Sequence, residues 1–149
     1  MAESKIKKFR EDEIIINEGD SNDTIYKVIS GSVAIYLNYK KENEYLVGIL
    51  SDKRYFGEDG FLSGRPSIFT AVAAEDTHVM GIGLNDFEGY LKNSYQNVLD
   101  IMRDMTEKMM TLKANLSLLD KELKDKIQRE TFKQKSREMV LNKYKIFSL

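Results

Sequence analysis

A glycine-rich segment from Phe56 to Ala71 contains the residues of this chain that are best suited to bind a ligand. It holds three glycines and the only proline of the sequence, so its backbone is expected to turn tightly and to approach another group closely. Successive backbone N–H groups in such a turn form a concavity that suits a phosphate, and a short helix start adds to it. Glu58 offers a carboxylate that can accept a hydrogen bond from a sugar hydroxyl. The segment therefore predicts an anion-binding loop, whose candidate ligand-binding residues are Gly57, Glu58, Gly60, Phe61, Leu62, Arg65, Pro66, Ser67, Ile68 and Thr70.

The sequence contains few residues that could carry out catalysis. There is no cysteine, which excludes disulfides, thiolate zinc sites and cysteine-ligated iron–sulfur clusters. The only histidine, His78, falls in a predicted strand and is interpreted as a sheet residue. In Glu58-Asp59 and in Glu75-Asp76 the two acidic residues are neighbours in the sequence. In an extended chain their carboxylates would point in opposite directions, so they would not form an acid/base pair. We expect no enzyme, no catalytic residue, no metal site and no cofactor.

The spacing of the loop residues resembles a known pattern. Phe56-Gly57-Glu58, then Ser63-Gly64 and Pro66, is similar to the phosphate-binding cassette of cyclic-nucleotide-binding domains, the sensor modules of the catabolite activator protein and FNR (Crp/Fnr) regulators. Gly19-Asp20 and the run from Ile25 to Val33 resemble the first hairpin of that family. The resemblance implies a regulatory role in signal transduction, a jelly-roll β-barrel, and a following helix that forms the dimer interface and moves when ligand binds.

One departure from the family pattern bears on the ligand. Nucleotide binders of the family place an arginine directly after the proline, to pair with the cyclic phosphate, and a small hydroxyl residue after it; here Ser67 and Ile68 stand there. Arg65 lies before Pro66, where the family's loop tends to face solvent. Phe69 fills part of the nucleotide space if it points into the barrel. We therefore expect cyclic-nucleotide binding to be altered or lost.

Glu58 has two interpretations that the sequence leaves open. It is placed to hold a ribose hydroxyl, and equally to accept backbone N–H bonds that keep the loop closed.

The elements around the loop follow from the distribution of glycine. All 9 glycines lie between Gly19 and Gly89, so the first part is expected to be β-structure and the rest helical. Short runs rich in β-branched and aromatic residues predict strands that close into an antiparallel barrel. These predicted strands are Ile25 to Ile29, Val33 to Leu37, Tyr45 to Leu50, Ile68 to Ala74 and Thr77 to Leu84.

Two helices are expected after the barrel. Asn85, with Glu88 three residues later, predicts an N-cap for a short helix over Asp86 to Lys92. A longer helix begins near Ser94 and carries an apolar heptad seam. The seam consists of Val98, Met102, Met105, Met109, Leu112, Leu116, Leu119 and Leu123.

The seam predicts a homodimeric coiled coil with left-handed supercoiling. The alternative is that the same stripe packs on the barrel. Lys108 and Lys113 would face each other across a parallel pair, which opposes tight association.

The domain organisation that follows is a barrel with short flanking helices over residues 1–93 and a helical region over 94–149. The latter divides into a dimer helix to about residue 123 and a helical tail over 124–149. From Asp120 onward there are nine basic and five acidic residues, typical of a solvated helix, although a basic helix can also bind nucleic acid or an anionic membrane.

The expected location is the cytoplasm, because no apolar run reaches a membrane span and the N-terminus lacks a signal peptide. No turns for a winged helix follow Leu123, so sequence-specific DNA binding by this chain alone is not expected. Partners are a second copy, a small-molecule effector and a protein. Two alternatives stay open: the effector domain of a Crp/Fnr-type transcription regulator whose DNA-binding domain is missing, and a ligand-free adaptor or scaffold.

Overall fold

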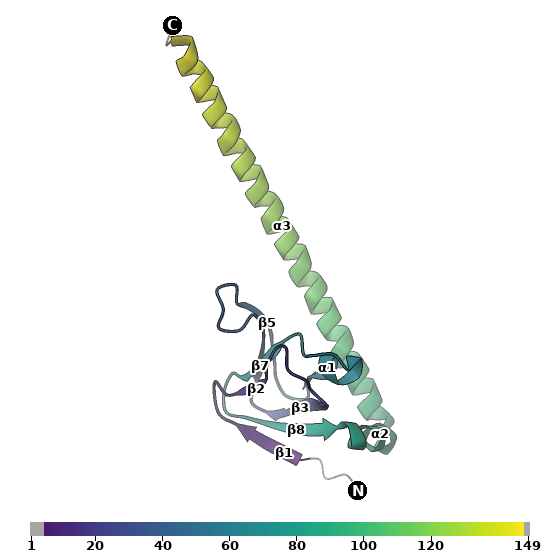
Figure 1. Cartoon of the computed structure of the whole chain (residues 1–149). Helices are drawn as coiled ribbons and strands as arrows, with labels where there is room; N and C mark the ends of the chain where they lie inside the picture. The colour runs from purple at the N-terminus through teal and green to yellow at the C-terminus, as the bar shows by residue number, and fades with distance from the viewer. Residues whose placement is uncertain (1–4, 148–149) are drawn as a thin grey trace. The chain divides into compact units, whose positions relative to one another are not determined.

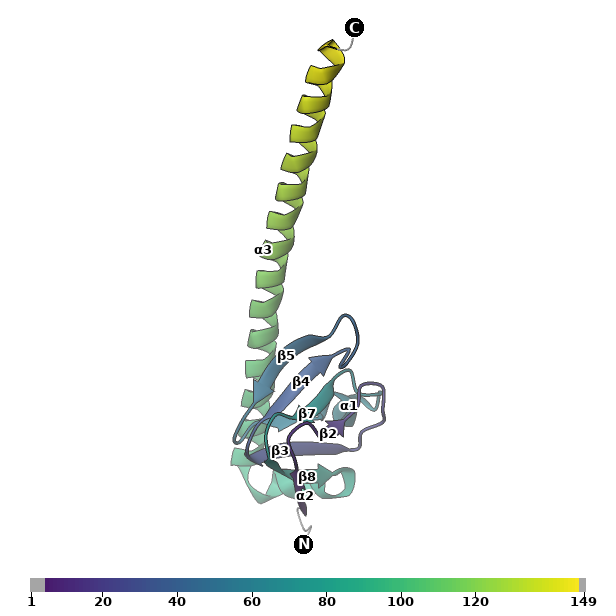
Figure 2. The same cartoon turned by 90° about the vertical axis from the view of Figure 1, so that its left-hand side faces the viewer.

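The computed structural model describes residues 5–147, with side chains to Tyr144. Its β-structure consists of two four-stranded antiparallel sheets (Figures 1 and 2). The first sheet has the order β1 (Lys5–Phe9), β8 (Thr77–Gly83), β3 (Thr24–Ser30) and β6 (Tyr55–Phe56). The second has the order β2 (Ile14–Ile16), β7 (Thr70–Ala73), β4 (Val33–Leu37) and β5 (Tyr45–Leu50). The expected antiparallel β module followed by a C-terminal helix is confirmed.

The strand predictions differ from the structure mainly at their ends. β4 and β5 have the predicted bounds, whereas β7 begins at Thr70 and not at Ile68, because Ile68 and Phe69 belong to the preceding loop. β1, β2 and β6 had no predicted counterpart. β1 is rich in lysine because it lies at the edge of its sheet, where charged side chains discourage pairing with another chain.

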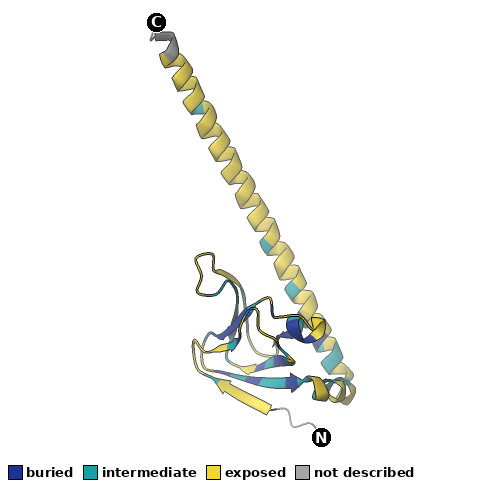
Figure 3. Cartoon of the chain, in the orientation of Figure 1, coloured by how far each residue is buried: buried dark blue, intermediate teal, exposed yellow. Residues whose placement is uncertain are grey.

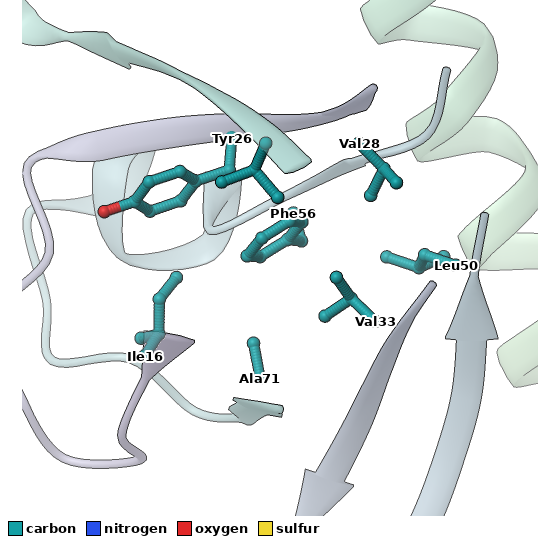
Figure 4. Close-up of a cluster of buried hydrophobic side chains, with 8 residues drawn as sticks. Ile16, Tyr26, Val28, Val33, Leu50, Phe56 and Ala71 are labelled. Atoms are coloured by element: carbon teal, nitrogen blue, oxygen red, sulfur yellow. The ribbon is translucent and has the colours of Figure 1, made fainter. Parts of the chain in front are cut away.

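Apolar side chains from both sheets meet in one core (Figure 4). Tyr26 and Phe56 stack with their ring centroids 5.2 Å apart, and Val28, Val33 and Val79 are fully buried around them. Full burial of a valine or phenylalanine side chain stabilises the fold by roughly 1.5–3 kcal/mol. The core therefore holds the two sheets together.

A second apolar cluster joins the first sheet to the helices. It contains Ile25, Tyr55 and Ile82 from the sheet, Phe61 from α1 (Glu58–Ser63) and Ile101 from α3 (Tyr95–Phe147). Phe87 of α2 (Leu84–Asn93) packs edge to face on Phe61, with 4.8 Å between centroids. All of these residues belong to one compact unit that extends to Thr106.

The helix starts test one predicted cap and one predicted helix start. The N-cap prediction at Asn85 is wrong: α2 begins at Leu84, directly after the extended residue Gly83, and has no side-chain cap. Since β8 runs into the helix at Gly83, Asn85 already lies inside the first turn. The prediction of a long helix beginning near Ser94 is confirmed, and Ser94 Oγ accepts a hydrogen bond from the Gln96 N–H at 3.1 Å.

The second unit, from Glu107 onward, consists of the remainder of α3. Most of its described side chains are exposed (Figure 3). Ser148 and Leu149, the end of the predicted tail, lie outside the described residues. Among the described residues, none of the helices combines the length and the apolar character that a membrane span requires.

Phe56→Ala is expected to destabilise the fold by about 3–5 kcal/mol, because it removes a buried ring and leaves a cavity between the sheets. Urea denaturation measures this loss. Tyr95→Ala is the matched control, since that ring is 90% exposed and its removal should change stability by less than about 0.5 kcal/mol. Equal effects of the two substitutions would contradict the assignment of the core.

Candidate ligand-binding cassette

The glycine-rich loop starts at a turn that only glycine fits. Gly57 has a φ of +85°, and a Cβ there would lie 2.9 Å from both Thr24 O and Asn22 Nδ2. The Asn22 amide donates to Thr24 O at 2.7 Å and to Gly57 O at 2.8 Å. The end of β6 is thus locked against β3, and this fixes where α1 begins.

The other two glycines of the loop shape α1 and its end. Gly60 is buried, and a Cβ there would lie 3.3 Å from Arg65 O. Gly64 has a φ of +67° and donates its N–H to Gly60 O at 3.0 Å, which terminates α1. The chain can therefore fold back closely over its own helix.

The segment after Pro66 is tied to the turn before β3. The Ser67 N–H donates to Asp20 O at 2.9 Å, and Ser67 O accepts from the Gly19 N–H at 2.7 Å. Thr70 Oγ1 accepts from the Glu18 N–H at 3.0 Å. Gly19-Asp20 and the loop were predicted separately, and the structure brings them together.

The side chain of Asp59 connects the two sides of the loop, a role that was not predicted from the sequence. Its Oδ2 accepts the Ile68 N–H at 2.8 Å and lies 3.2 Å from Ser67 Oγ. Ser67 Oγ is also 2.9 Å from Phe69 O, so its single proton serves one of two acceptors at a time. The only sequence signal was an acidic residue in the first turn of a short helix, which does not indicate a contact eight or nine residues away.

The remaining candidate residues are distributed over different environments. Phe61 and Thr70 are buried, Glu58 and Phe69 are half-buried, and Arg65 and Pro66 are exposed. Leu62 and Ile68 are 53% and 56% exposed. Ser67, which stands in the place of the family's arginine, is 3% exposed.

A polar junction connects the strand before the loop to α3. Asp104 is 4% exposed, pairs with Arg54 and accepts the Tyr55 N–H at 3.2 Å. Tyr55 and Tyr90 share a hydrogen bond between their hydroxyls at 2.5 Å. Burial, together with the Tyr90 hydroxyl, raises the pKa of Tyr55 above its ordinary value. Burial also raises the pKa of Tyr90.

The seam predicted on α3 begins at the half-buried Val98 and is exposed from Met102 onward. Ile101 and Asp104 are buried in the first unit, whereas their neighbours Met102 and Met105 are 59% and 41% exposed. From Met109 onward, every seam residue is at least 40% exposed. Among the seam residues up to Thr106, Val98 is half-buried, whereas Met102 and Met105 are exposed.

Comparison with known proteins gives a family match and a set of similar folds. The model of the cyclic nucleotide-binding domain family matches residues 6–94. The catabolite activator protein of Thermus thermophilus is 21% identical, with a TM-score of 0.65 over 78% of this chain and 55% of that chain. A transcriptional regulator of the CRP/FNR family, also from Thermus thermophilus, is 19% identical, with a TM-score of 0.65 over 78% of this chain and 57% of that chain.

A third similar structure is the regulator CLP of Xanthomonas campestris. It is 18% identical, with a TM-score of 0.71 over 78% of this chain and 59% of that chain. The chain thus spans little more than half the length of these regulators. No curated protein matches the sequence.

Gly57→Ala is expected to destabilise the fold by at least about 2 kcal/mol, because a left-handed backbone costs about 1–2 kcal/mol for a non-glycine residue and the added Cβ meets Thr24 O. Thermal and urea denaturation measure the loss. Gly48→Ala is the control, since no atom lies within 4 Å of its Cβ position. A stable Gly57→Ala variant would show that the turn is not fixed as described.

Proposed function

Because the chain belongs to the cyclic nucleotide-binding domain family, we propose that it is a homodimeric, ligand-sensing regulatory module in which the usual binding of cyclic nucleotides is altered or lost. The observation that carries the proposal is the buried Ser67. It stands where the family's nucleotide binders have the phosphate-pairing arginine, and its side chain is already hydrogen-bonded within the loop. A neutral hydroxyl cannot replace a bidentate guanidinium as a partner for phosphate.

The cassette has a continuous physical connection to the first turns of α3. Phe61 of α1 packs in the same cluster as Ile101, and β6, which leads into Gly57, is bonded to Asp104. A displacement of α1 by an effector would therefore change the packing of residues on α3. This connection gives a sensor the element whose equilibrium a ligand can bias.

Dimerisation through α3 is supported by the exposed apolar seam. Leucines and methionines at heptad spacing are unfavourable in water and are typical of a helix that pairs with a copy of itself. The methionines in the first half of the seam can repack when the helices shift, because their side chains are flexible. A seam of this composition suits a regulatory interface.

Exchange of the ligand is compatible with the fold. The Xanthomonas campestris regulator is described as responsive to c-di-GMP, whereas the family takes its name from cyclic nucleotides in general. The effector of the present chain is proposed to bind at the cassette without the arginine-mediated phosphate contact.

A second candidate function is that of the effector part of a Crp/Fnr-type transcription regulator. The observation that favours it is the similarity to three regulators that are longer than the matched region. In that case the same dimer helix would carry the ligand signal to a DNA-binding part.

Titration calorimetry of the unchanged chain tests the ligand claim. Loss of a charged contact costs about 2–5 kcal/mol, so cAMP and cGMP are expected to bind tens to thousands of times more weakly than to an arginine-containing cassette. Micromolar affinity for either nucleotide would refute this part of the proposal.

Sedimentation equilibrium at tens of micromolar protein tests the dimer. The unchanged chain is expected to have twice the monomer mass, and Leu112→Lys to shift it toward the monomer, because the lysines of both helices would meet in the seam. Ser117→Lys is the matched control, since Ser117 is exposed and lies off the seam. A monomeric unchanged chain, or an undiminished mass for Leu112→Lys, would contradict the dimer.

A further inference from the structure

The Ile68 N–H and the Ser67 hydroxyl both lie within hydrogen-bond distance of one oxygen of the chain itself, and the hydroxyl shares its proton between that oxygen and Phe69 O. The Ile68 N–H donates to Asp59 Oδ2 at 2.8 Å, and Ser67 Oγ lies 3.2 Å from the same oxygen. Asp59 comes from the first turn of α1, whereas both donors come from the segment that returns over it. The carboxylate therefore bridges the two sides of the loop.

A carboxylate and a phosphate compete for such donors. Both are anionic oxygen acceptors, and both form their strongest hydrogen bonds with N–H and O–H groups in partly dehydrated positions. A phosphate that approached Ile68 N would have to displace Asp59 from it. If it did not, it would face the like charge of Asp59 at close range.

We propose that Asp59 determines the specificity of the cassette: its carboxylate takes the place of a ligand phosphate at Ser67 and Ile68, so that the site rejects phosphate-bearing ligands. This inference rests on the proposed function, since it concerns the same loop. It adds a second cause to the missing arginine, namely a built-in anion that holds the loop closed.

The two causes predict different results when arginine is restored. If the arginine alone were missing, Ser67→Arg would be enough to recover cyclic-nucleotide binding. With Asp59 in place, the new guanidinium has a carboxylate partner within the loop, and the Ile68 N–H stays occupied. Recovery then requires removal of the Asp59 charge as well.

The experiment compares three variants of the full chain by titration calorimetry with cAMP. They are Ser67→Arg, the double variant Asp59→Ala with Ser67→Arg, and a control that combines Ser67→Arg with Asp52→Ala, a change of an exposed loop carboxylate. Removal of a like charge from the site should make the double variant bind cAMP at least about 10-fold more tightly than Ser67→Arg alone. The control should bind as Ser67→Arg does. Equal affinity of Ser67→Arg and the double variant, or no binding by either, would overturn the proposal.

A conservative change at Asp59 guards against loss of folding through that substitution, and thermal denaturation of each variant checks that arginine at the buried position 67 is tolerated. Asp59→Asn with Ser67→Arg keeps the shape of the side chain and removes its charge, and it should also bind cAMP more tightly than Ser67→Arg. In the otherwise unchanged chain, Asp59→Ala should accelerate hydrogen exchange of the Ile68 amide, and an unchanged exchange rate would overturn the bridge.

These results are separable from the test of the proposed function. Micromolar binding of cAMP by the unchanged chain refutes the altered ligand response. The ratio of affinities with and without Asp59, both measured with arginine at position 67, decides the role of Asp59 alone.

Discussion

The burial of Asp104 against β6 is the constraint on which the connection between the sheets and α3 depends. A carboxylate that is 4% exposed is stable only when its charge is paired and hydrogen-bonded. Arg54, directly before β6, supplies the charge, and the N–H of Tyr55, the first residue of β6, supplies a backbone bond, so two consecutive residues hold one residue of the helix. Because β6 continues directly into Gly57, the helix and the cassette are attached to opposite ends of the same short segment.

The sequence predicted much of the sheet structure because the local pattern and the tertiary contacts agree there. β4 and β5 are continuous apolar runs bounded by turns, and their predicted bounds agree with the structure to the residue. β6 has only two residues, and its existence depends on pairing with Tyr26 and Lys27, a contact that no local pattern shows. The cap at Asn85 was misplaced for a related reason, since the end of β8 decides where the following helix starts.

The cassette shows the same division between local and non-local information. Gly57 and Gly64 were identifiable as turn residues, and both have positive φ. Ser67 was identifiable as a departure from the family's pattern, but its burial was not, because the bonds that bury it come from Gly19 and Asp20. Asp59 could not be singled out at all, since its partners are brought to it only when the chain folds back over α1.

A loop that is closed by its own carboxylate changes what a ligand has to do. A ligand shifts a conformational equilibrium only as far as its affinities for the two states differ. In an open cassette, an anion gains its affinity by recruiting the donors and so orders the loop, whereas here Asp59 already holds the Ile68 N–H and Phe61 is already packed with Phe87 and Ile101. Under the proposed function, an effector of this chain would have to act by displacing Asp59 or by contacts elsewhere on α1, and its signal would reach the first turns of α3 through the apolar cluster that Phe61 and Ile101 share.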